Sequence, residues 1–216
     1  MTSGAENRFD TAIAAIDAAN ADDPNTLVVD GETRPKELAH AEMVTAWVRQ
    51  LVADPSDALL LAARAHHLRR WVVPRSSYPE GRAGYLRWRR DLHGRHAEEV
   101  GAILTACGYE DATVSRVQEL VQKKGLGTKG APADPETQAL EDALCLVFIE
   151  TQFAELASRF DDDKVVEIVR KTLKKMSDAG KAAALAITLD PADRALIERA
   201  VAAAESVQQP NEGETS

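Results

Sequence analysis

The chain of 216 residues contains few cysteines, few aromatic residues and no long apolar run. Its two cysteines, Cys107 and Cys145, stand apart in apolar stretches, so we predict packed thiols and neither a disulfide framework nor a C-x-x-C metal site. The longest purely apolar run, residues 143–149, is far shorter than the roughly 20 residues of a membrane helix. The N-terminus also lacks the apolar segment of a signal peptide. These absences predict a cytoplasmic protein with no membrane partner.

Several common catalytic motifs are also missing. The sequence has no G-x-x-x-x-G-K-[ST] phosphate loop, no G-x-G-x-x-G after a strand and no G-x-S-x-G elbow. The segment GLGTKG at residues 125–130 lacks the strand and helix that a phosphate loop needs. ATP-dependent kinase chemistry is therefore not expected.

Apolar residues recur at helical spacing along almost the whole chain, which predicts an all-α fold. A main helical domain is expected over residues 1–160, a helical extension packed on it over 161–205, and a disordered tail over 206–216. The first expected helix ends near Asn20. The others are expected over residues 35–51, 54–70, 85–107, 111–124, 136–160, 164–176, 178–188 and 191–205. Residues 22–35 are expected to form an extended connection with a D-G turn, and residues 72–84 a loop.

The formal charge is −9, but one segment has the opposite sign. Residues 64–95 hold nine arginines and only two acids, Glu80 and Asp91, which gives this segment a net +7. Guanidinium groups bind phosphate and carboxylate oxygens bidentately, so the segment favours an anionic ligand. The alternative is a set of solvated or ion-paired arginines.

Polar residues occur on stripes that otherwise predict core. His40, His66, His96 and Asp142 each share a helical face with apolar neighbours. A buried carboxylate must meet a cation, a hydrogen-bond donor or a metal. Imidazoles and a carboxylate from different helices form a typical site for a first-row divalent metal, with Mn, Fe, Co, Ni and Zn all compatible. The alternative for each histidine is a hydrogen-bonded core imidazole. His67 directly follows His66, so both can reach one ion only near a helix end.

The order of these residues resembles the HD-domain superfamily of metal-dependent phosphohydrolases. It is carried by His40 and by the segments AARAHHL, HAEEVGAIL, V-x-x-L-V-x-x-K and LEDALCL. The resemblance covers about residues 35–160 and implies an all-α, HD-like bundle. More narrowly, segments such as VDGETRPKELAHAE and GRAGYLRW resemble a bacterial and plant family known as domain of unknown function 4202.

The HD resemblance implies roles for individual residues. It implies His40, His66, His67, His96 and Asp142 as metal ligands, although His67 stands where that superfamily has an aspartate. Glu37 or Glu98 is expected as general base, and Lys124 as a fixed charge in place of a ligand histidine. Phosphate would meet the arginines that flank or occupy the loop after the paired histidines, which are Arg69, Arg70, Arg75 and Arg82. The expected activity is hydrolysis of a phosphorylated ligand.

The segment YLRWRR interleaves Tyr85 and Trp88 with Arg87, which favours a nucleotide-like ligand. In the alternative, these two aromatic rings simply pack inward. Two other classes of protein stay open. One is a non-catalytic protein that binds RNA or an acidic partner and keeps a degenerate metal site. The other is a ferritin-like di-iron oxidase, suggested by Glu37-x-x-His40 but disfavoured because that fold needs a second E-x-x-H motif.

Overall fold

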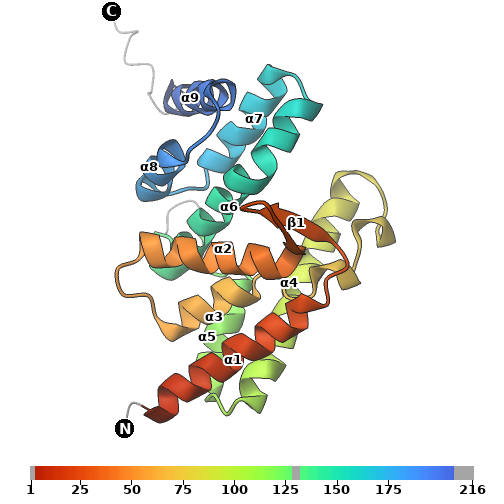
Figure 1. Cartoon of the computed structure of the whole chain (residues 1–216), viewed down its shortest axis with the longest axis vertical. Helices are drawn as coiled ribbons and strands as arrows, with labels where there is room; N and C mark the ends of the chain where they lie inside the picture. Colours follow the sequence, from red (N-terminus) through yellow and green to blue (C-terminus); the bar gives the residue numbers. More distant parts are fainter. Residues whose placement is uncertain (1–2, 128–131, 207–216) are drawn as a thin grey trace, which may run out of the picture. The chain divides into compact units, whose positions relative to one another are not determined.

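The computed structural model describes residues 3–127 and 132–206, which form helices and one small hairpin (Figure 1). The predicted all-α class is confirmed. The elements in chain order are α1 (Ser3–Ala21), β1 (Thr26–Val29), β2 (Glu32–Pro35), α2 (Lys36–Leu51), α3 (Asp57–Ala65), α4 (Gly81–Ala106), α5 (Asp111–Val121), α6 (Pro135–Arg159), α7 (Asp162–Leu173), α8 (Asp178–Ala186) and α9 (Pro191–Ser206). Within these residues, no helix is both long and apolar enough to cross a membrane.

The chain divides into two compact units, Met1–Leu140 and Glu141–Ser216. The division falls inside α6, whereas the sequence places it at residue 160. In the first unit α3 packs on α2 and α5, and α4 packs on α5. In the second unit α7 packs on α9 through buried side chains such as Val169 and Ile197. Apart from Ser206, the predicted disordered tail lies outside the described residues.

The connection between α1 and α2 is a paired hairpin and not merely an extended strand. Strands β1 and β2 are antiparallel, with Val29 opposite Glu32. The two residues between them, Asp30 and Gly31, have φ values of 51° and 81°. Positive φ at both positions is what a two-residue hairpin turn of type I′ requires, so the D-G dipeptide determines this turn.

Two local predictions around α3 were wrong. The helix begins at Asp57 and not at residue 54, and the side chain of Ser56 caps it by accepting a hydrogen bond from the amide of Leu59. At the other end α3 stops at Ala65 instead of continuing to about Arg70. The chain then turns, and Arg69 adopts a left-handed conformation with φ of 50°.

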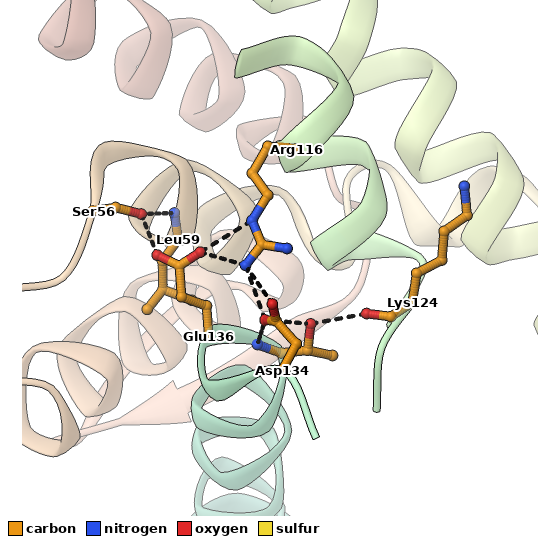
Figure 2. Close-up of polar contacts among 7 residues, drawn as sticks. Ser56, Leu59, Arg116, Lys124, Asp134 and Glu136 are labelled. Carbon is orange, nitrogen blue, oxygen red and sulfur yellow. Dashed lines mark hydrogen bonds and ion pairs between the residues drawn. The ribbon is translucent and has the colours of Figure 1, made fainter. Parts of the chain in front are cut away.

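The starts of α3 and α6 are joined to α5 by one polar network around Arg116 (Figure 2). Its guanidinium pairs with Asp134 at 2.9 Å and with Glu136 at 2.5 Å. Asp134 also accepts the amide of Thr137 in the first turn of α6. Glu136 accepts a hydrogen bond from the hydroxyl of Ser56, the residue that caps α3. One arginine therefore holds the starts of α3 and α6 against α5.

We expect Arg116→Ala to lower the free energy of unfolding by about 1–2 kcal/mol, because Asp134 and Glu136 lose a shared charged donor. Burial raises the pKa of Asp134, but hydrogen bonds from Arg116 and Thr137 offset this and hold it below its usual 3.8. The contribution is therefore present above about pH 4 and is lost as the pH falls through the lowered pKa. Urea titrations above pH 4 and below the lowered pKa of Asp134 test this, with a variant at an exposed arginine, Arg49→Ala, as control. Equal losses in both variants would contradict it.

Candidate metal centre

Three side chains from two elements converge at the start of α2. Glu37 and His40 lie one turn apart on α2, so both side chains project on the same side. His67 reaches them from the turn that follows α3. One ligand atom from each of the three residues lies within 4.8 Å of the other two. In the described part of the chain, no other group of three or more His, Cys, Asp or Glu side chains lies close enough together to hold one metal ion.

All five histidines of the chain belong to one cluster of rings. His67 is at its centre: its ring stacks on His40 with centroids 4.5 Å apart and lies 4.8 Å from His66 and 6.2 Å from His96. His93 extends the cluster, with its ring 6.0 Å from that of His66. The fifth histidine therefore belongs to the ring cluster but not to the group of candidate ligands, and its sequence context of arginines gave no signal for this position.

The turn after α3 is held by contacts that position these rings. The left-handed Arg69 donates its amide to Asn20 Oδ1 of α1 at 3.0 Å, which fixes the path of the chain after His67. The preceding carbonyl, that of Leu68, accepts a hydrogen bond from His96 Nδ1 at 2.8 Å. In neutral His96 this bond places the proton on Nδ1 and leaves Nε2 as an acceptor or ligand atom.

The surroundings keep the imidazoles neutral. Burial lowers the pKa of His40 to about 3 and that of His96 to about 4. Burial, reinforced by Lys123 near His66 and by Arg70 near His67, also places the pKa values of these two histidines well below 6.5. Neutral imidazole is the form that binds a metal. His66 Nδ1 is buried without a hydrogen-bond partner.

Glu37 is the carboxylate of this site, and it is only 4% exposed. Its Oε2 lies 3.1 Å from His67 Nδ1, and its Oε1 lies 3.7 Å from the guanidinium of Arg70. The HD resemblance implies a general base at Glu37, whereas its place among the imidazoles makes it a candidate ligand. The sequence did carry a signal for this ligand role, because Glu37-x-x-His40 places the two side chains one helical turn apart.

Asp142 has other partners. Its carboxylate accepts hydrogen bonds from the amide and the hydroxyl of Ser177, at 2.9 Å and 2.5 Å, at the start of α8. Gly180 packs so closely that an added Cβ would lie 2.6 Å from Asp142 Cγ. Hydrogen-bond donors of its own unit thus satisfy the buried carboxylate that the sequence offered as a ligand.

The remaining predicted residues are distributed over the first unit. Arg70 lies beside Glu37 and over the ring of Trp88, 5.2 Å from its centroid. Trp88 is buried and donates Nε1 to the carbonyl of Val73. Arg75 binds the carbonyls of Tyr78, Pro79 and Gly81, so it holds the loop before α4. Exposed positions are occupied by Arg69, Arg82, Tyr85, Arg87, Glu98 and Lys124.

Residues 10–197 match the family model DUF4202, described as a domain of unknown function. The chain belongs to the DUF4202 family. No curated protein and no solved structure matches it.

For this DUF4202 protein, the partners of Asp142 predict a structural role. We expect Asp142→Ala to lower the free energy of unfolding by about 1–3 kcal/mol, because the amide of Ser177 loses its buried acceptor. Ser177→Ala should also destabilise, and the double variant should lose less than the sum of the two single losses. Metal content should equal that of the wild type. Loss of metal at unchanged stability would contradict this assignment.

The neutral histidines predict acid sensitivity. In EDTA, the free energy of unfolding should fall between about pH 7 and about pH 5, because the unfolded chain takes up protons near pH 6.5 while the buried imidazoles stay neutral. His96→Gln, which can still donate to Leu68, should reduce this slope by about one proton. Urea titrations across this range measure the slope, and an identical slope in the variant would refute the explanation.

Proposed function

We propose that this DUF4202 protein is a divalent-metal-dependent phosphohydrolase of HD-like type, with Glu37, His40 and His67 as protein ligands. The observation that carries the proposal is the convergence of these three side chains within 4.8 Å. The substrate would be a small phosphorylated molecule or a nucleotide.

The donor set fits a first-row transition metal. Two imidazoles and one carboxylate are a frequent ligand set for Zn²⁺ and Fe²⁺, and Mn²⁺, Co²⁺ and Ni²⁺ accept the same donors. Three protein ligands leave coordination positions open for substrate and water, as catalytic sites require. Bonds of about 2.1 Å place neighbouring ligand atoms about 3–3.5 Å apart, so the side chains must close by roughly an ångström.

The charge of Glu37 supports the same conclusion. A nearly buried carboxylate needs compensation, and the imidazoles beside it are neutral. The positive group in contact is Arg70, at 3.7 Å and one-third exposed. A divalent ion would compensate the carboxylate more fully and would use the neutral imidazoles as ligands.

Glu37 also bears on the HD resemblance. In that superfamily an aspartate follows the histidine that matches His66, and here His67 stands in its place. Glu37 contacts His67 directly and brings a carboxylate to the site from the neighbouring helix. The ligand set then keeps one negative charge, although a different element supplies it.

The surrounding residues suit a phosphoryl group. A bound divalent ion would supply a Lewis acid that polarises a phosphoryl oxygen and lowers the pKa of water. Arg70 is placed to bind another oxygen of that group, and its position over the Trp88 ring holds the guanidinium at the site.

Metal content tests the proposal. Protein purified without a histidine tag, incubated with Mn²⁺, Fe²⁺, Co²⁺, Ni²⁺ or Zn²⁺ and then dialysed, should retain about one ion per chain. His40→Ala, His67→Ala and Glu37→Gln should weaken retention at least tenfold, because each removes a ligand. His93→Ala and Glu98→Gln are matched controls that lie outside the ligand group and should retain the ion. Negligible metal in the folded wild type would refute the proposal.

Hydrolysis is tested on the loaded protein with a panel of nucleotides and sugar phosphates. Phosphate release should require the ion and should fall at least tenfold in Arg70→Gln at unchanged metal content. Full metal binding without release from any substrate would refute the hydrolase assignment. Salt-sensitive retention of RNA by the same protein would then favour the non-catalytic alternative.

A further inference from the structure

A second feature of the first unit is an open pocket of about 590 Å³ between α4 and the end of α5. Its size lies in the range of small-molecule sites. The residues that line it are Leu86, Arg89, Arg90, His93, Gly94, Gln122 and Lys124. None of them belongs to the Glu37, His40 and His67 group, so the pocket is a separate candidate site.

Two local features of the backbone form the pocket. On α4, Leu86, Arg90 and His93 follow one another at helical spacing and therefore share a face. Gly94 lies beside them, and a Cβ added there would meet nothing within 4 Å, so this wall is open. At the end of α5, Lys123 has a φ of 57°, a conformation that non-glycine residues adopt rarely and that often marks functional sites.

The left-handed Lys123 directs the chain so that its neighbours Gln122 and Lys124 both line the pocket. Lys124 is anchored through its backbone carbonyl, which accepts the hydroxyl of Thr137 at 2.9 Å. Figure 2 shows the side chain of Lys124 extending away from the network around Arg116. The ammonium group is thus held by a fixed backbone and remains available to a ligand.

The charge of the lining is positive. Arg89, Arg90 and Lys124 contribute three cations, and no carboxylate lines the pocket. Among residues 7–127 and 132–203, neither Arg89 nor Lys124 forms an ion pair, while Arg90 contacts the half-exposed Asp91 at 3.2 Å. An exposed pair of that kind contributes little, so it does not compete strongly with a multivalent anion. Leu86, 52% exposed, adds an apolar surface.

We infer that this pocket binds an organic polyphosphate, with the phosphate groups on Arg89, Arg90 and Lys124 and the organic part against Leu86. Two guanidinium forks and an ammonium match at least two linked phosphoryl groups better than a single one. Gln122 and His93 add neutral polar groups at the same wall. The inference does not depend on a metal, because the pocket contains none of the three candidate ligands Glu37, His40 and His67.

Calorimetry in EDTA and low salt tests the inference, with ATP, tripolyphosphate and adenosine as probes. ATP and tripolyphosphate should bind and adenosine should not, because the phosphates supply most of the interaction. Arg89→Gln and Lys124→Gln should each weaken ATP binding about tenfold or more, the loss expected for one charged hydrogen-bonding group.

Two further variants separate a built pocket from general attraction to positive charge. Gly94→Leu removes no charge, favours helix and fills the open wall, so it should abolish binding while the protein stays folded. Arg49→Gln removes an exposed arginine of α2 and should leave the affinity unchanged. Absence of polyphosphate binding by the folded wild type, or equal weakening by Arg49→Gln, would overturn the inference. Because no metal is present, its failure would be distinct from that of the metal site.

Discussion

Buried imidazoles and carboxylates lose favourable hydration, so a cluster of them persists only where the backbone supplies fixed partners. In this protein the turn from Ala65 to Arg70 supplies them. The Arg69 amide is held by Asn20, and the Leu68 carbonyl holds His96. If α3 continued as a regular helix, His67 would follow His66 by about 100° around the axis. The helix instead ends at Ala65, and the turn that follows it, with Arg69 in the left-handed conformation, lets His67 meet Glu37 and His40.

Helices were well predicted because burial of one face imposes a period that a short window of sequence shows. The end of α3 could not be predicted in the same way. Its turn depends on Asn20, which lies 49 positions earlier in the chain. The pairing of β1 with β2 was missed for a related reason, since a D-G dipeptide indicates a turn but not whether its flanks pair.

The candidate site was predictable in part. Apolar stripes correctly pointed to His40, His66 and His96 as buried, and the structure also brings His67 and His93 to them. The same reasoning could not decide how a buried carboxylate is satisfied. Asp142 meets Ser177, 35 positions away, and nothing in the sequence near either residue indicates that pairing. A polar residue on an apolar stripe identifies a need for partners, and only the fold identifies the partners.

The arginine-rich segment shows why a local sum of charge overstates what a ligand meets. Arg64 pairs with Asp17 and lies 3.5 Å from Glu42, two acids that precede the segment. The guanidinium of Arg75 donates hydrogen bonds to backbone carbonyls of the loop before α4. Their charges stabilise the first unit and are not available to a phosphate. Arg89 and Arg90 differ because α4 carries them to a pocket where Lys124 adds charge and no carboxylate is part of the lining. Anion binding depends on this local imbalance, which arises only when α4 and the end of α5 meet.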